Sequence, residues 1–163
     1  DTEELINYIN NKSIISTCFD NQKRLDDPIT KFVLYSHGLN NKISLGYSHD
    51  NEDKLNFTVS DIEKINSNSF YNPDTYFGSC NTGTKGDNSF SQKWVNQVGG
   101  TTWAHYGRSD YTNINAGVGP LIKMSRSKHG FSFYGSKNYP TPSEDPKDYI
   151  DGKKTDIYEF RRR

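Results

Sequence analysis

The sequence has little sulfur and no excess charge. Only two cysteines, Cys18 and Cys80, and one methionine occur among 163 residues. Two cysteines are too few for the disulfide framework that stabilises many small secreted domains. Lysine and arginine number 20, as do aspartate and glutamate, so the formal charge is zero. A neutral chain lacks the attraction that draws proteins to nucleic acids and anionic membranes, and we expect neither partner.

Long apolar runs and metal-binding motifs are also missing. No stretch of about 18 residues is apolar throughout, so no membrane-spanning helix is expected. The four histidines are scattered and no CxxC, HExxH or EF-hand spacing occurs, so we predict no metal and no cofactor. Apolar residues make up only 31 %, but aromatic residues reach 13 % and bury large areas each. The length predicts one domain over residues 1–163.

Strand and helix signals alternate along the chain. The clearest strand is 31–36, whose unbroken apolar run is typical of a strand buried on both faces. The later signals are a helix opened by a capping box at Ser60, a strand over 75–79 after Pro73-Asp74, a helix from Ser89 to Gly99-Gly100, and a strand over 101–106. Such alternation predicts an α/β fold with these three strands as parallel neighbours, in a mostly parallel sheet with helices on both faces.

The two ends of the chain carry weaker signals. Residues 2–10 have the spacing of an amphipathic helix behind a capping Asp1 or Thr2, and 13–19 has the composition of a short strand. A turn at Asn40-Asn41 leads into a strand over 42–47. From Gly117 onward we expect a strand over 131–134 and then an irregular, proline-marked tail that ends in Arg161–Arg163.

Two reactive side chains follow two of the predicted parallel strands. His37 ends the strand 31–36, and Cys80 ends the strand 75–79. Ligands of open α/β sheets bind at the carboxyl ends of the strands, so we expect both side chains in one crevice. An imidazole beside a thiol converts it to a nucleophilic thiolate. Gly38 leaves its backbone N–H bare, and with the Cys80 N–H it offers an oxyanion site.

These motifs resemble a known group of enzymes. Ser36-His37-Gly38 and Tyr76-Phe-Gly-Ser-Cys-Asn-Thr-Gly83 are similar to motifs of the caspase–gingipain–hemoglobinase cysteine peptidases, above all of bacterial toxin-associated and CHAT-type members. The likeness covers about residues 31–111. It implies a caspase-like three-layer sandwich with His37 as general acid or base and Cys80 as nucleophile, acting on a protein or peptide. It also implies an effector or processing domain of a larger bacterial protein, secreted or delivered.

Other functions fit the same residues. A single cysteine at a strand end is usually a small buried apolar residue, and we assign that packing role to Cys18. A non-catalytic recognition module could keep this fold without His37 and Cys80 facing each other. A thiol enzyme with another acyl-transfer activity, such as an amidase, would use the same pair, so the sequence alone does not separate it from a peptidase.

Specificity is expected to come from the segment after the strand 101–106. There Tyr106 offers an aromatic wall, while Arg108 and Asp110 offer opposite charges. A buried unpaired charge is costly, so each must pair internally or await a substrate of opposite charge. If Arg108 and Asp110 pair together, an apolar side chain is preferred before the cut. We favour Asp110 facing the cleft, which predicts Arg or Lys there. The sequence does not indicate the oligomeric state.

Overall fold

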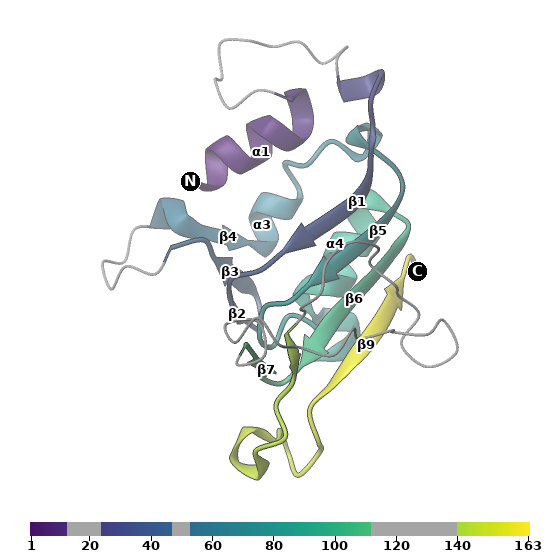
Figure 1. Cartoon of the computed structure of the whole chain (residues 1–163). Helices are drawn as coiled ribbons and strands as arrows, with labels where there is room; N and C mark the ends of the chain where they lie inside the picture. Colours follow the sequence, from purple (N-terminus) through teal and green to yellow (C-terminus); the bar gives the residue numbers. More distant parts are fainter. Residues whose placement is uncertain (13–23, 47–52, 112–139) are drawn as a thin grey trace.

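The computed structural model describes residues 1–12, 24–46, 53–111 and 140–163 (Figure 1). Its centre is a four-stranded sheet with the order β1-β5-β6-β9. The strands are β1 (Ile29–Leu34), β5 (Phe70–Phe77), β6 (Thr101–Tyr106) and β9 (Asp156–Arg161). β1 runs parallel to β5 and β5 parallel to β6, whereas β9 is antiparallel to β6. The protein is thus mixed α/β with a mostly parallel central sheet, and the three predicted parallel neighbours are confirmed.

Two smaller sheets flank the carboxyl ends of these strands. One is antiparallel and has the order β2-β3-β4, and the other pairs β7 with β8. Their bounds are β2 (His37–Leu39), β3 (Lys42–Ser44), β4 (Asn56–Thr58), β7 (Ser109–Asp110) and β8 (Thr141–Pro142). The predicted turn at Asn40-Asn41 is confirmed, since it joins β2 to β3. His37 therefore lies in a hairpin of its own and not at the tip of β1.

The helices begin at side-chain caps. Asp1 and Glu4 form a capping box at the start of α1 (Thr2–Asn11), and Ser89 caps α4 (Phe90–Val98). The predicted start at Ser60 is wrong: α3 (Val59–Ile62) has Thr58 as its N-cap, and the Asp61 carboxylate accepts from the Thr58 N–H at 2.9 Å. The described residues also form 3₁₀ turns: η1 (Asp53–Leu55), η2 (Ser67–Ser69), η3 (Gly86–Asn88) and η4 (Pro146–Asp148).

An aromatic core joins the helices to one face of the central sheet. Trp94 of α4 is fully buried, stacks on Phe32 with centroids 4.9 Å apart, and meets Phe77 edge-on at 5.4 Å. Its indole N–H donates to the hydroxyl of Thr75 at 3.1 Å, so the one polar atom of the ring is satisfied. Side chains of α1, α3 and the small β2-β3-β4 sheet complete the cluster: Ile6, Ile9, Ile43, Phe57 and Ile62.

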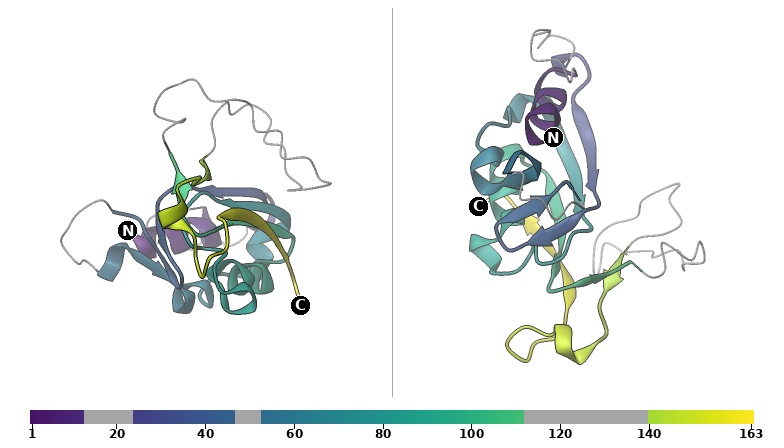
Figure 2. Two further views of the ribbon diagram at one scale, coloured as in Figure 1. Left: turned by 90° about the horizontal axis from the view of Figure 1, so that it is seen from below. Right: turned by 90° about the vertical axis from the view of Figure 1, so that its left-hand side faces the viewer.

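The opposite face of the sheet is also buried but more polar. Figure 2 shows α1, α3 and α4 together on one side of the sheet. In the described part of the chain, the other face carries no α-helix, and the helices that we predicted there stay a prediction. Tyr76, Trp103 and His105 are buried on that face. The Tyr76 hydroxyl lies 2.9 Å from the Nε2 of His105 and donates to the carbonyl of Pro140 at 3.1 Å.

The structure corrects two further boundaries. β5 runs through Pro73, which we expected to precede the strand, because the pairing of β1 with β5 is interrupted there and Asn72 has a φ of 42°. A bulge of this kind tolerates proline within a strand. The expected irregular tail is wrong for Asp156–Arg161, which pairs with β6 along its whole length as β9. The expected strands over 13–19 and 131–134 lie outside the described residues.

Candidate active site

The two sequence motifs meet at the carboxyl end of the central sheet. A Cβ atom added to Gly38 would lie 2.1 Å from the carbonyl oxygen of Cys80 and 2.8 Å from the Cβ of Ser79. Atoms at those distances overlap, so the main chain of Cys80 lies directly against the Cα of Gly38 and only glycine fits. The Gly78 N–H donates to the Leu34 carbonyl at 3.0 Å and extends the β1–β5 pairing towards this contact. The structure therefore places the His37-Gly38 and Ser79-Cys80 segments side by side.

The turn after Cys80 is fixed against the end of β6. Asn81 has a φ of 59°, and its N–H donates to the Gly107 carbonyl at 2.7 Å. The Gly83 N–H reaches the His105 carbonyl at 2.9 Å, and the Thr82 hydroxyl donates to the Ser79 carbonyl at 2.9 Å. A non-glycine residue in a left-handed conformation costs free energy and often marks a functional turn. This turn positions Cys80 on a rigid support.

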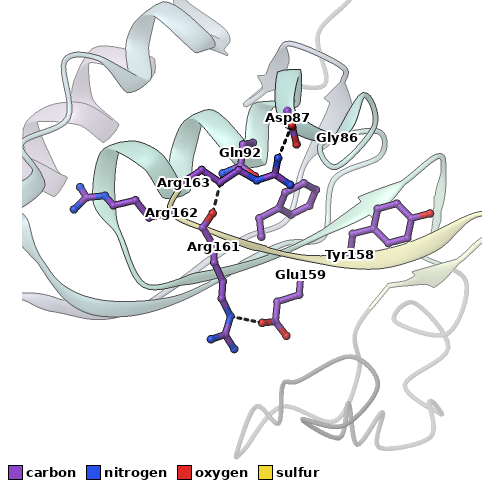
Figure 3. Close-up of a pocket in the computed structure, with 9 residues that line it drawn as sticks. Gly86, Asp87, Gln92, Tyr158, Glu159, Arg161, Arg162 and Arg163 are labelled. Atoms are coloured by element: carbon purple, nitrogen blue, oxygen red, sulfur yellow. Dashed lines mark hydrogen bonds and ion pairs between the residues drawn. The ribbon is translucent and has the colours of Figure 1, made fainter.

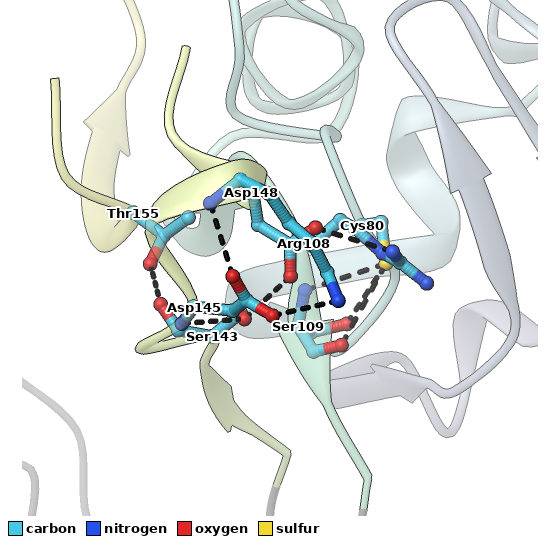
Figure 4. Close-up of polar contacts among 8 residues, drawn as sticks. Cys80, Arg108, Ser109, Ser143, Asp145, Asp148 and Thr155 are labelled. Atoms are coloured by element: carbon cyan, nitrogen blue, oxygen red, sulfur yellow. Dashed lines mark hydrogen bonds and ion pairs between the residues drawn. The ribbon is translucent and has the colours of Figure 1, made fainter. Parts of the chain in front are cut away.

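The sulfur of Cys80 faces the first residue of β7. The backbone N–H of Ser109 donates to Sγ at 3.3 Å, and the Ser109 hydroxyl oxygen lies 3.3 Å from the same atom (Figure 4). Cys80 is half-buried and not in a disulfide. Hydrogen bonds strengthen when the acceptor carries a charge, so the Ser109 N–H stabilises a thiolate more than a thiol. The sequence analysis missed Ser109, although its place just after β6 was a usable signal.

A charged network lies behind this contact. The guanidinium of Arg108 binds the carboxylate of Asp148 at 3.1 Å, and that carboxylate also accepts from the Ser143 hydroxyl at 2.6 Å. The hydrogen bond to Asp148 is the main cause that raises the pKa of Arg108, and Cys80 acts in the same direction. Figure 4 shows the Arg108 side chain between Asp148 and Cys80. Asp148 lies 40 residues from Arg108 in the sequence, so no local sequence pattern predicts this pair.

Two backbone N–H groups are directed away from the sheets at this point. Gly38 pairs with Ile43 one step from the two-residue turn of the β2–β3 hairpin. Pairs of an antiparallel ladder alternate between hydrogen-bonded and non-hydrogen-bonded, and the pair that closes such a turn is the bonded one. The Gly38 N–H therefore points away from β3. The N–H of Cys80 has no backbone acceptor in the described part of the chain.

The expected specificity residues line two different recesses. Arg108 and Asp110 border an open recess of about 350 Å³ next to Ser109, whose other lining residues include Ser143, Glu144, Asp145, Lys147 and Asp148. Tyr106 lies instead in a recess of about 700 Å³ on the side of Leu39 and Asn81. There its ring packs against Tyr158 with centroids 5.3 Å apart, and the amine of Lys153 sits over both rings. Cys80 thus lies between a charged recess and an aromatic one.

His105 is close to this site in the sequence, but its side chain packs inside the protein against the central sheet. Its ring is fully buried, and burial lowers the pKa of His105 to about 3. Since the Tyr76 hydroxyl donates to Pro140, it accepts the proton of His105 Nε2. Nδ1 is then an unprotonated acceptor, and among the described residues it has no hydrogen-bond partner. A ring locked in this neutral state does not exchange protons near neutral pH.

The C-terminal arginines form contacts in a separate recess (Figure 3). Arg161 binds Glu159 at 2.6 Å, Arg163 pairs with Asp87, and the Arg162 guanidinium donates to the carbonyl of Asn96 at 3.2 Å. Asn96 is in the last turn of α4, where a cation interacts favourably with the exposed carbonyls. Arg162 therefore joins the end of β9 to α4, whereas Arg161 pairs within β9 and Arg163 pairs with η3.

The remaining predicted residues are placed as follows. The side chain of His37 is exposed. Cys18 lies outside the described residues. Within those residues, no three His, Cys, Asp or Glu side chains gather in a way that would hold a metal ion, and no helix is long and apolar enough to cross a bilayer. Comparison with known proteins gives no match to a family model, a curated protein or a solved structure.

Proposed function

We propose that the protein is a cysteine endopeptidase with a caspase-like arrangement, in which Cys80 is the nucleophile and His37 the general acid and base. The main support is the contact between the backbones of Gly38 and Cys80, which joins the two motifs at one sheet edge. The N–H donor of Ser109 aimed at the sulfur of the half-buried Cys80 adds to this support. A recognition module would have no need for a nucleophile so arranged.

The proposed reaction proceeds through a thioester. The Cys80 thiolate adds to the scissile carbonyl carbon, and the resulting oxyanion accepts hydrogen bonds from the N–H groups of Gly38 and Cys80. His37, protonated when it took up the thiol proton, returns that proton to the leaving amine as the C–N bond breaks. Water then attacks the thioester with His37 as base, releasing the acid and the free thiol. No metal or cofactor takes part.

The substrate is proposed to be a peptide segment that carries a basic side chain before the cut. Among the described residues, four carboxylates and two cations line the recess next to Ser109, and the cations form the pairs Arg108–Asp148 and Lys147–Asp145. The lining therefore keeps an excess of negative charge, which attracts arginine or lysine. Asp110, in this lining, is the residue to which we assign that preference.

The decisive experiment measures both reactivity and turnover. Wild-type protein, Cys80→Ala and His37→Ala are incubated with a peptide library, and iodoacetamide labelling is mapped by mass spectrometry. We expect Cys80 to be the labelled site and both substitutions to lower cleavage by about 10³-fold or more. Cys18→Ala serves as the control and should change turnover by at most a few-fold.

The outcomes separate the three functions left open by the sequence. Cleavage that survives Cys80→Ala rejects the assignment of the nucleophile. Amine incorporation or side-chain amide hydrolysis without peptide cleavage indicates another thiol acyl-transfer enzyme. A Cys80 that iodoacetamide does not modify in the folded protein, together with no turnover, favours a recognition module.

A further inference from the structure

We infer that Arg108, held in place by Asp148, is a cation that stabilises the Cys80 thiolate, independently of the imidazole of His37. This inference deepens the proposed function, on which its catalytic meaning rests, by naming a second group that activates the nucleophile. Its basis is geometric: Arg108 precedes Ser109, whose N–H lies 3.3 Å from Sγ, and its guanidinium extends between Asp148 and Cys80 (Figure 4).

Contacts of its backbone and of its side chain fix the position of Arg108, although the residue lies at the surface. Its own carbonyl accepts from the Ser143 N–H at 3.0 Å, which pins its backbone beside β8. Its side chain is 63 % exposed, but that of Asp148 is only 10 % exposed. A carboxylate that is itself held, by the Ser143 hydroxyl at 2.6 Å, fixes a long flexible side chain better than a free one does. Asp148 is therefore a positioning residue.

The chemistry of the guanidinium excludes Arg108 as a proton carrier. A guanidinium stays protonated throughout the range in which proteins fold, so the thiol proton leaves to His37 or to water. Arg108 contributes only its charge, and an opposite charge within about 4–6 Å favours the ionised form of a group. The charged side chains in the described lining of the recess beside Ser109 are Arg108, Asp110, Glu144, Asp145, Lys147 and Asp148. On the other side of Cys80 lies β2, which carries the titratable side chain of His37 and whose Gly38 contacts the Cys80 backbone.

The pH profile of alkylation tests this role without any substrate. The rate of iodoacetamide modification of Cys80, resolved by mass spectrometry from that of Cys18, is measured between pH 5 and pH 9. We expect Arg108→Gln to move the midpoint up by roughly half to one pH unit, which means about three- to tenfold slower modification below the midpoint. Arg108→Lys, which keeps the charge, should recover part of the shift. Arg161→Gln removes a similar exposed ion pair and should leave the profile unchanged.

Asp148→Asn distinguishes positioning from simple charge. If Asp148 acted on the sulfur only as a negative charge, its removal would lower the midpoint. Because we assign it the role of holding Arg108, we expect the midpoint to rise. An unchanged midpoint in Arg108→Gln, or a lower one in Asp148→Asn, would overturn the inference. Each variant is checked by thermal unfolding, and Arg108→Lys keeps the test decisive if Asp148→Asn does not fold.

The profile also separates this inference from the proposed function. If Arg108→Gln shifts alkylation and no peptide is cleaved by the wild type, the cation–thiolate pair stands and the peptidase proposal fails. If His37→Ala abolishes cleavage while Arg108→Gln leaves alkylation unchanged, the peptidase proposal stands and this inference fails.

Discussion

The helix-covered core and the carboxyl edge of the sheet differ in what holds their residues in place. In the core, Trp94 is enclosed by aromatic rings and its one polar atom is satisfied. At the edge, Gly38 and Cys80 touch through their backbones, Asn81 adopts a left-handed conformation, and Cys80 is only half-buried. Packing in the core stabilises the fold, whereas the contacts at the edge hold reactive groups in arrangements that do not themselves stabilise the protein. Substitutions should therefore separate the two: core changes unfold the protein, and edge changes inactivate it.

The largest effect on stability is expected for Trp94→Ala. This change removes a fully buried ring that contacts Phe32, Phe57 and Phe77, and it leaves a cavity. Buried Trp→Ala substitutions cost about 3–5 kcal/mol of unfolding free energy. Urea unfolding followed by circular dichroism gives the loss, and Trp94→Phe should lose much less. If Trp94→Ala costs under about 1 kcal/mol, the core is not where the stability lies.

Gly38→Ala should instead act first on activity, and because its Cβ would meet main-chain atoms of Cys80 it should also lower stability. The new methyl group would overlap the Cys80 carbonyl, so β2 must move away from Cys80 and the oxyanion donors separate. Loss of one such donor lowers turnover by about 10²–10³-fold. Peptide turnover and the melting temperature are compared with those of Gly86→Asn, a glycine in open space with a positive φ that asparagine tolerates. A fully active Gly38→Ala would mean that the close approach has no catalytic role.

His105 sharpens the comparison because it is a buried polar group close to the edge. Its pKa is lowered to about 3 in the folded protein, against 6.5 for an ordinary histidine. The unfolded chain therefore binds the proton more readily, and stability is full above pH 6.5 and falls as the pH drops towards 3. Between pH 6.5 and pH 5 the loss should be about 2 kcal/mol. His105→Gln, which keeps a donor for Tyr76, should flatten this dependence in urea titrations, and an unchanged slope would refute the assignment.

The sequence was informative where local patterns decide structure. The apolar runs of β1 and β6 and the cap at Ser89 predicted the three parallel strands and α4, because such signals act over a few residues. The expected burial of the first strand on both faces is wrong, because β1 lies at the edge of the described sheet and is only partly buried. β9 escaped detection because its pattern is short and mixed with charges, and only its pairing with β6 makes it a strand. Helices on both faces of the sheet were expected from the alternation of strand and helix signals, but that alternation does not indicate the face on which each helix packs.

The site divides in the same way. His37 and Cys80 were predicted to share one site because each follows an apolar strand and parallel strands bring their carboxyl ends together. The structure brings the backbones of Gly38 and Cys80 into contact, and the roles of His37 and Cys80 stay a prediction. Asp148 was not found, since its pairing with Arg108 depends on the path of residues 140–163. The expected grouping of Tyr106 with Arg108 and Asp110 is wrong because the chain bends at Gly107, where φ is 79°. Tyr106 consequently lines one recess and the two charged residues another.

The smallest effect is expected for Asp110→Asn, which tests selectivity at the edge without touching the nucleophile. Carboxylates outnumber cations among the described residues that line the recess, and we expect cleavage after Arg or Lys. In a partly solvated recess one charge pair contributes roughly 1 kcal/mol, so the preference for basic over apolar residues should fall about five- to tenfold. Peptide-library profiling of the wild type and Asp110→Asn measures the ratio, with Glu144→Gln as a carboxylate control in the same lining. A basic preference that survives Asp110→Asn at full strength, or one that is lost equally in Glu144→Gln, would show that the recess selects by its summed charge and not through Asp110.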